Sequence, residues 1–262
     1  AFMKKLGNGN NIDEMLKDYI KRVETVEAKN EEIINYCKAL DDNMKIVPED
    51  YYKENGGVIF PNPNAPTGLL MDLDSVRDII EHNKDVVVIV DEAYIDFGGV
   101  SAKDLVNEYD NVLVVQTFSK SRSMAGMRIG YAFGSKELIK ALNDVKFSFN
   151  SYTMNMTSID MGVASINDKK YFEECVERIT ATRERTKEEL TKLGFTFPDS
   201  KANFIFATHK SVPAKEIFEK LKDLNIFVRY FAQPGIDNYL RITIGTDEQM
   251  DKLISALSEI VG

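Results

Sequence analysis

The stretch that decides the fold is Val112-Leu-Val-Val-Gln-Thr-Phe-Ser-Lys-Ser-Arg-Ser-Met-Ala-Gly-Met-Arg-Ile-Gly130. Its first four residues are apolar and indicate a buried strand, which leads into a loop with one lysine, Lys120. Hydroxyl groups flank this lysine at Thr117 and Ser119, and Arg128 follows. A guanidinium group is a rigid pair of donors that suits phosphate. The stretch therefore has the composition of a site for a phosphorylated ligand.

Lys120 has two interpretations. Lysine is the usual nucleophile toward an aldehyde cofactor, and neighbouring cations or burial can keep enough of it deprotonated. On this interpretation Lys120 holds pyridoxal phosphate as a Schiff base. The alternative is an ordinary solvated turn between a strand and a helix, and a short motif alone does not separate the two.

The composition is that of an ordinary globular protein of 262 residues, long enough for one large domain or two of ~100–200 residues. A formal net charge of −9 argues against nucleic acid or an anionic membrane as the main partner. The two cysteines, Cys37 and Cys175, indicate neither a disulfide framework nor a zinc site. No apolar run approaches the ~20 residues that span a bilayer, and the start lacks the apolar core of a signal peptide. We therefore expect a cytoplasmic protein without a membrane partner.

Helices and strands alternate through the middle of the chain. Residues 72–83 have apolar positions at helical spacing, and they lead into Val86-Val-Val-Ile-Val-Asp91. Five consecutive apolar residues are typical of a strand buried on both faces in a parallel sheet. Apolar runs at 112–115 and 129–134 continue the pattern. We therefore predict an α/β domain with a mostly parallel sheet and helices on its faces.

Polar residues stand where these strands end. A short apolar strand at 58–60 leads into the loop Asn62-Pro-Asn-Ala-Pro-Thr-Gly68, and Asp91 ends the next strand. In open α/β sheets, ligands bind at the carboxyl ends of the strands. A carboxylate at the tip of a buried strand is costly unless it has a cationic partner. The alternatives are a loop chosen for turn geometry and an aspartate that caps a helix.

The later part of the chain changes character. Long helices are predicted at 138–145, 157–166 and 169–193, and the last section mixes strands, one of them at 226–230, with helices. We predict a helical segment over 1–40, a large domain over 41–160 and a small α+β domain over 161–262. Arg229 and Arg241 lie in apolar strands of the small domain. Each needs an anion, either a protein carboxylate or a group of the substrate.

Four motifs, taken together, resemble those of a known family. They are Asn62–Gly68, Asp91-Glu-Ala-Tyr94, the Lys120 stretch up to Arg128, and Tyr239-Leu-Arg-Ile-Thr-Ile-Gly-Thr246. In this order they resemble the fold type I pyridoxal-phosphate aminotransferases, and within these most closely the histidinol-phosphate aminotransferases. The resemblance covers roughly residues 41–262. It implies a homodimer of histidine biosynthesis that exchanges an amino group between small-molecule amino acids and 2-oxo acids.

The resemblance also implies a role for each matching residue. Lys120 would be the Schiff-base lysine and the base that moves the proton of the substrate's α-carbon. Asp91 would pair with the pyridine nitrogen, and Tyr94 would donate a hydrogen bond to the cofactor's phenolic oxygen. Asn64 would contact the same oxygen. The cofactor's phosphate would be bound by Thr117, Ser119 and Arg128, and the substrate's anionic groups by Arg241 and Arg229.

The sequence departs from the family pattern in two places. Ala65 stands directly before Pro-Thr-Gly, where many members have Asn, and this bears on the assignment of Asn64. At the front, Leu6-Gly-Asn-Gly9 resembles a remnant of the family's phosphate loop, but most of the segment around it is missing. The alternative hypothesis is therefore a truncated or rearranged relative whose site is incomplete, inactive or able only to bind the cofactor.

Overall fold

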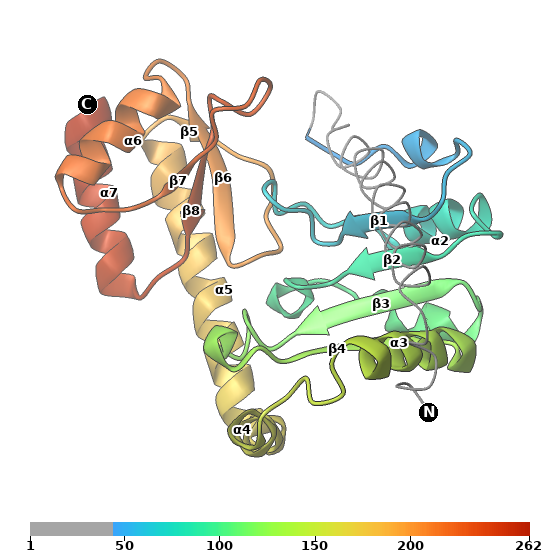
Figure 1. Ribbon diagram of the computed structural model, residues 1–262. Helices are drawn as coiled ribbons and strands as arrows, with labels where there is room; N and C mark the ends of the chain where they lie inside the picture. The colour runs from blue at the N-terminus through green and yellow to red at the C-terminus, as the bar shows by residue number, and fades with distance from the viewer. Residues whose placement is uncertain (1–43) are drawn as a thin grey trace, which may run out of the picture.

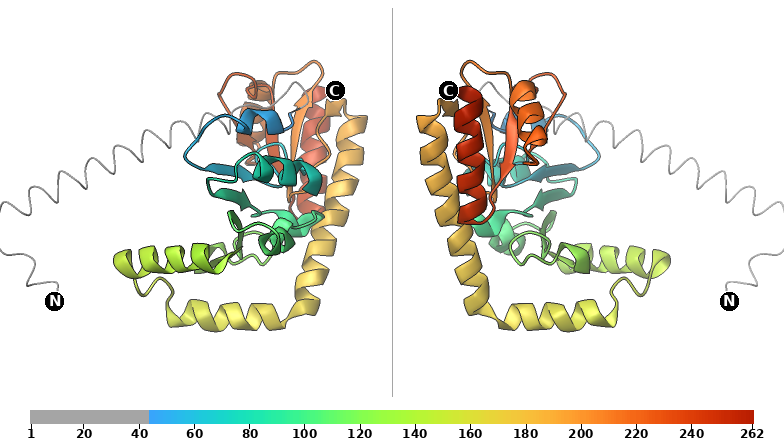
Figure 2. Two further views of the ribbon diagram at one scale, coloured as in Figure 1. Left: turned by 90° about the vertical axis from the view of Figure 1, so that its right-hand side faces the viewer. Right: turned by 90° about the vertical axis from the view of Figure 1, so that its left-hand side faces the viewer.

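The computed structural model describes residues 44–262, so the helical segment predicted for 1–40 lies outside the described residues (Figure 1). These residues form two four-stranded sheets, and the long helix α5 runs past both of them (Figures 1 and 2). The strands are β1 (Val58–Pro61), β2 (Val88–Asp91), β3 (Val112–Thr117), β4 (Gly130–Gly134), β5 (Phe195–Thr196), β6 (Phe204–His209), β7 (Arg229–Tyr230) and β8 (Leu240–Thr243). The α-helices are α2 (Leu73–Glu81), α3 (Lys136–Phe149), α4 (Met156–Asn167), α5 (Lys169–Lys192), α6 (Ala214–Asp223) and α7 (Asp247–Val261).

The first sheet has the strand order β1-β2-β3-β4. Its first three strands are parallel, and β4 is antiparallel to β3. This confirms the predicted α/β fold with a mostly parallel sheet. Burying one large apolar side chain stabilises a fold by roughly 1.5–3 kcal/mol. The parallel strands supply six such side chains to one core cluster, namely Val58, Phe60, Val88, Val90, Val112 and Val114.

Helix α2 packs into this cluster at the position predicted from its periodicity. Val76, Ile79 and Ile80 are fully buried, as expected for one apolar stripe. Asp72 caps the helix, because its carboxylate accepts a hydrogen bond from the Ser75 backbone N–H at 2.8 Å. That bond holds the pKa of Asp72 below its usual value. The sequence therefore encodes both the packing face and the start of the helix.

The second sheet is antiparallel throughout, with the order β5-β6-β8-β7. Leu190, Ile217 and Leu257 bring α5, α6 and α7 into its core. The predicted strand at 226–230 is wrong in length, because β7 begins only at Arg229. The backbone N–H of Ile226 instead donates to Leu221 O, and this bond closes the end of α6.

A buried arginine on α5 joins the two sheets. The guanidinium of Arg183 is only 4% exposed, and its Nη1 donates to Phe97 O and to Ala202 O, both at 2.9 Å. Phe97 ends the short 3-10 helix η2 (Ile95–Phe97), which follows β2, and Ala202 lies just before β6. One side chain therefore fixes loops from both sheets relative to each other.

A second cation on α5, Lys187, makes the stability of the fold depend on pH. Lys187 Nζ lies 2.6 Å from the Asp199 carboxylate, and the hydrogen bond holds the pKa of Asp199 below its usual 3.8. Since the folded pKa lies below the unfolded one, the stabilisation is complete above about pH 4 and is lost as the pH falls through the folded value. We expect Asp199→Asn to lower the free energy of unfolding at pH 7 by about 1 kcal/mol or less, because the carboxylate is largely exposed. The free energy of unfolding should also fall less in acid for the variant than for the wild type.

Urea unfolding of both proteins between pH 7 and pH 3 measures this difference. Asp104→Asn is the matched control, because within residues 44–262 Asp104 pairs only with the neighbouring, exposed Lys103. Identical pH profiles for the wild type and Asp199→Asn would refute the assignment.

Gly68 marks a close contact between the loop after β1 and the segment before β6. Its φ is +79°, and a Cβ there would lie 2.3 Å from the buried Ser200 Oγ. We expect Gly68→Ala to lower the free energy of unfolding by about 1–3 kcal/mol, because the methyl group must displace Ser200 in a strained backbone. Urea unfolding measures the loss. Gly126→Ala is the control, since its Cβ would meet nothing within 4 Å, and an equal loss in both variants would contradict the expectation.

Two negative findings concern the part of the chain from Met44 to Gly262. No helix in it combines the length and the apolar character needed to cross a membrane. The same residues contain no cluster of three or more His, Cys, Asp or Glu side chains that could hold a metal ion.

Candidate functional site

The carboxyl ends of the three parallel strands lie side by side at one edge of the first sheet. Pro61, Asp91 and Val115 are register partners on β1, β2 and β3. The backbone N–H of Asn62 donates to Asp91 O at 2.8 Å, which joins the next loop to the same edge. Thr117 ends β3 two residues beyond Val115. The sheet therefore brings the predicted polar positions of three strands to one place.

Lys120 lies in the loop after β3, and its ammonium group faces an aromatic ring. Nζ is 5.3 Å from the centroid of the Tyr94 ring, which is a cation–π distance. Lys120 is half-buried, and it takes part in no ion pair with another residue of 44–262. The next residue, Ser121, donates a hydrogen bond from its hydroxyl to the Asp96 carboxylate. An amine that is not bound to a carboxylate can serve as a nucleophile once it has lost its proton.

The predicted phosphate ligands are only partly assembled. The Thr117 hydroxyl lies 2.9 Å from Ser119 Oγ and 3.1 Å from Ile129 O. These two hydroxyl groups are therefore neighbours, as the sequence predicts. Arg128 is exposed and has a left-handed φ of 56°, and its Nη1 donates to Ala125 O at 3.1 Å. Its guanidinium thus lies on its own turn.

Asp91 and Asn64 differ in their hydrogen-bond partners. The half-buried Asp91 carboxylate accepts a hydrogen bond from the Ala93 backbone N–H at 3.0 Å. The buried Asn64 accepts from the Thr67 hydroxyl at 2.8 Å through Oδ1, so this oxygen is already used within its own loop. Asn64 also lines a cavity of about 330 Å³. Its amide nitrogen is the group that remains for a ligand.

Arg241 and Arg229 are brought together by the second sheet. They are register partners on β8 and β7, and both guanidinium groups lie over the Phe231 ring, at 5.7 and 5.4 Å from its centroid. Arg241 Nε is buried and has no hydrogen-bond partner among the described residues. Two like charges directly opposite each other on paired strands destabilise a sheet. This pair is therefore suited to an anionic ligand.

Phe204 connects the two halves of the site. Its ring meets the Tyr94 ring edge-on at 5.1 Å, and the Arg241 guanidinium lies 5.1 Å from it on the second sheet. The contacts therefore run from Lys120 through Tyr94 and Phe204 to Arg241. Sequence reasoning missed Phe204, because an aromatic residue at the start of an apolar strand looks like any core residue.

Glu92 is a second residue that the sequence reasoning passed over. It follows Asp91 and is 1% exposed, and burial raises the pKa of its carboxyl. A second acid directly after a buried strand was the available signal, because an unpaired buried carboxylate is costly.

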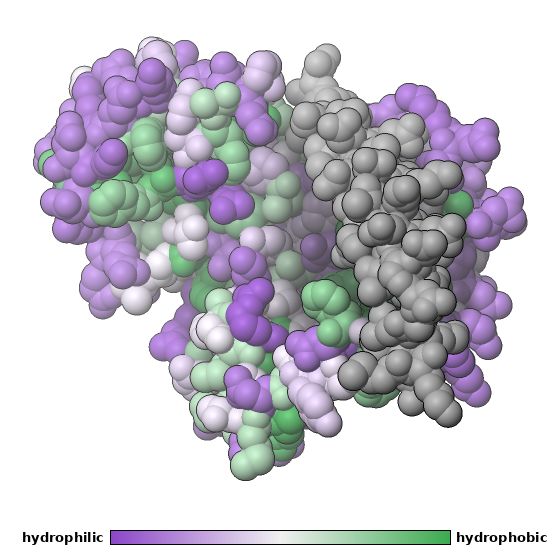
Figure 3. All heavy atoms as spheres, viewed as in Figure 1, coloured by the Kyte–Doolittle hydropathy of each residue, from purple (hydrophilic) through white to green (hydrophobic). Residues whose placement is uncertain are grey.

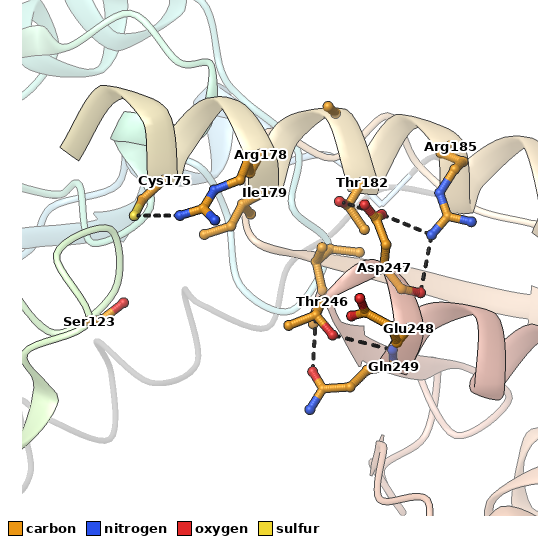
Figure 4. Close-up of a pocket in the computed structure, with 13 residues that line it drawn as sticks. Ser123, Cys175, Arg178, Ile179, Thr182, Arg185, Thr246, Asp247, Glu248 and Gln249 are labelled. Atoms are coloured by element: carbon orange, nitrogen blue, oxygen red, sulfur yellow. Dashed lines mark hydrogen bonds and ion pairs between the residues drawn. The ribbon is translucent and has the colours of Figure 1, made fainter. Parts of the chain in front are cut away.

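A cavity of about 770 Å³ lies elsewhere (Figure 4). Residues of α5 face the start of α7 across it, and its charged groups largely pair with protein atoms. Arg185 bonds to Asp247 and Asp251, and the Thr182 hydroxyl and Arg185 hold the pKa of Asp247 below its usual range. None of the predicted site residues lines this cavity. The larger space is therefore not the place where the predicted chemistry converges.

Comparison with known proteins agrees with the geometry. The family model of the aminotransferases of class I and II matches residues 14–257. The chain is 54% identical over 222 residues to the histidinol-phosphate aminotransferase of Clostridium beijerinckii, which is 85% of this chain and 62% of that protein. It is 51% identical over 223 residues to the histidinol-phosphate aminotransferase of Brachyspira hyodysenteriae, with 85% and 63% covered. The chain thus spans less than two thirds of the length of these curated relatives.

Solved structures agree in fold. The histidinol-phosphate aminotransferase from Clostridium acetobutylicum matches with a TM-score of 0.78 at 26% identity, over 84% of this chain and 69% of that chain. The enzyme of the same name from Sinorhizobium meliloti, in complex with pyridoxal-5'-phosphate, matches with a TM-score of 0.76 at 23% identity, over 85% of this chain and 62% of that chain. With a family model over most of its length and relatives at more than half identity, the chain belongs to the aminotransferase class I and II family.

Proposed function

We propose that this chain is a pyridoxal-phosphate-dependent aminotransferase of histidine biosynthesis. It would transfer an amino group between glutamate or 2-oxoglutarate and histidinol phosphate or imidazole-acetol phosphate. The observation that carries the proposal is the line of contacts from Lys120 through Tyr94 and Phe204 to Arg241. It places an amine and a partly unsatisfied arginine on opposite sides of one aromatic pair. The names of the relatives support the choice of substrates.

The described residues fit most groups of the cofactor. Lys120 Nζ takes part in no ion pair within 44–262, and the Asp91 carboxylate stands at a strand end, where it accepts a hydrogen bond from the Ala93 backbone N–H. The Thr117 and Ser119 hydroxyls lie together, and Arg128 would have to leave Ala125 O to reach a phosphate. When bound, pyridoxal phosphate supplies an electron-accepting ring that stabilises negative charge on the substrate's α-carbon.

Each residue of the chain then has a defined task. Lys120 would bind the cofactor's aldehyde carbon and carry the α-proton of the substrate on Nζ. The Tyr94 ring holds Nζ in place through the cation–π contact. Asp91 would keep a proton on the ring nitrogen by ion pairing. Arg241 would grip the substrate carboxylate with its fork of donors, and Arg229 adds a second cation for a substrate that carries phosphate.

A turnover assay tests this function. We expect the cofactor-loaded protein to form histidinol phosphate from imidazole-acetol phosphate at a rate that depends on glutamate. Cofactor binding without turnover would favour the alternative that the sequence left open, a relative with a cofactor-only site. Failure to bind the cofactor at all would overturn the proposed function and leave the alternative of a truncated or rearranged relative with an incomplete, inactive site.

We also infer that the protein forms a homodimer through α3 and α4. These two helices project from the body of the molecule (Figure 2), and hydrophobic side chains gather over α4 at the lower end of Figure 3. Contiguous exposed apolar patches of this kind mark interaction sites. The large apolar residues exposed on the two helices are Leu142, Val145, Phe147, Phe149, Met156, Ile159, Met161, Val163 and Ile166.

The expected cytoplasmic location stays a prediction.

Light scattering measures the oligomeric state. We expect the wild type to have the mass of a dimer, and we expect Val145→Glu combined with Ile159→Glu to shift it to the monomer, because two charges would be buried without partners. Val100→Glu is the matched control, since Val100 is 61% exposed, against 68% for Val145, but lies outside both helices. A monomeric wild type would rule out this dimer.

A further inference from the structure

Glu92 is a buried carboxylate to which the proposed chemistry gives no task. Its Oε1 accepts from the Ala102 backbone N–H at 2.6 Å. Its Oε2 accepts from the Ser101 hydroxyl at 2.6 Å and from the Gln116 side-chain amide at 2.7 Å. Burial raises the pKa of Glu92, and these three donors oppose the rise. The carboxylate is therefore fully bonded, although water hardly reaches it.

These bonds close a loop at its base. Glu92 stands at one end of the loop 92–102, and Ser101 and Ala102 stand at the other. Gln116 extends the connection across the sheet, because its Oε1 accepts from the Tyr131 phenol at 2.7 Å. The base of the loop is thus tied to β2, β3 and β4.

The same loop carries Tyr94 and contacts the elements around it. Tyr94 contacts both Lys120 and Phe204 with its ring. The Asp96 carboxylate accepts a hydrogen bond from Ser121, next to Lys120. The Phe97 carbonyl accepts one from Arg183 on α5. Movement of the loop would therefore displace the Tyr94 ring from Nζ and from the second sheet.

We propose that Glu92 is a positioning residue, which closes the loop 92–102 and so holds the Tyr94 ring beside Lys120. The inference rests on the proposed function, since the role of Lys120 gives this position its consequence. Hydrogen bonding, not charge, is the property required. A glutamine at position 92 can keep the bonds, because the Gln116 amide can turn over and the Tyr131 phenol can then accept instead of donate.

Three variants separate the possible roles. Glu92→Ala removes all three bonds, and Glu92→Gln removes the charge alone. Asn83→Ala is the matched control: Asn83 is also buried, and its amide donates to Tyr51 O and Ile79 O at the opposite end of β2. The readouts are thermal unfolding, the dissociation constant of pyridoxal phosphate, the absorbance of the loaded protein as a function of pH, and kcat and KM.

We expect Glu92→Ala to weaken cofactor binding roughly tenfold, as one lost buried hydrogen-bonding group does. It should shift the absorbance-versus-pH curve and lower kcat by roughly 10- to 100-fold through misplacement, with a smaller change in KM. Glu92→Gln should stay within about threefold of the wild type in each readout. Asn83→Ala should lose thermal stability but keep the wild-type absorbance-versus-pH curve, cofactor dissociation constant, kcat and KM.

Each other outcome has a definite meaning. If Glu92→Gln fails as badly as Glu92→Ala, the charge matters and the proposal is wrong. If Glu92→Ala changes only thermal stability, Glu92 is merely structural and the proposal is again wrong. If Glu92→Ala does not fold, Gln116→Leu removes one of the same bonds, and an unshifted curve there would overturn the proposal. A wild type that binds no cofactor would instead refute the proposed function.

Discussion

Lys120→Ala is expected to abolish both covalent attachment of pyridoxal phosphate and transamination. The reason is that Lys120 Nζ is the amine that lies against Tyr94 at the strand ends, and alanine offers neither a nucleophile nor a base. Loss of general base catalysis alone lowers a rate by roughly 10²–10⁴-fold. The absorbance spectrum after addition of the cofactor and the glutamate-dependent rate measure the two effects.

Lys140→Ala is the control for this variant, because Lys140 is exposed and, in the part of the chain that the structure describes, pairs only with Asp144 on α3. It should keep the spectrum and the rate of the wild type. An unchanged spectrum in Lys120→Ala would mean that another group holds the cofactor.

Arg241→Ala is expected to raise KM for glutamate strongly while changing kcat much less. A carboxylate that Arg241 binds before and during the reaction contributes equally to both states, so its loss appears in KM. Truncating one member of a buried charged pair costs roughly 2–5 kcal/mol, which corresponds to about 30-fold or more in kcat/KM. Steady-state kinetics with varied glutamate measure the change.

Two further variants sharpen this test. Arg241→Lys keeps the charge but loses the planar fork, and it should recover only part of kcat/KM. Arg185→Ala is the control, because Arg185 pairs with Asp247 and Asp251, away from Phe204. A rise in KM that is no larger in Arg241→Ala than in Arg185→Ala would exclude Arg241 from substrate binding.

Much of the fold could be predicted from hydrophobic periodicity. The long helices and the buried parallel strands have clear patterns, and they lie where these patterns place them. The two-residue strand β5 (Phe195–Thr196) and the 3-10 helices are too short to show a period. The strand predicted at 226–230 is too long at its start. The apolar pattern there is typical of a strand, but Ile226 donates to Leu221 O and so ends α6. The division of the chain into domains near residue 160 stays a prediction.

For the site, the sequence predicts which residue types are present but not their contacts. Lys120, Asp91 and Arg241 stand out because charged groups at the ends or in the middle of apolar strands need partners. The contact of Tyr94 with Phe204 depends on how the two sheets pack, and nothing local in the sequence indicates it. The same holds for Glu92, whose three donors come from separate elements. The assigned roles of the site residues stay predictions until variants are measured.

Borohydride reduction of the cofactor-loaded protein, followed by peptide mass spectrometry, tests most directly whether Lys120 is the amine that binds pyridoxal phosphate. Reduction turns a lysine-bound cofactor into a stable secondary amine, so the modified residue can be identified in its peptide. We predict a pyridoxyl group on Lys120. A pyridoxyl group on a different lysine, or an unmodified Lys120 peptide, would contradict the assignment.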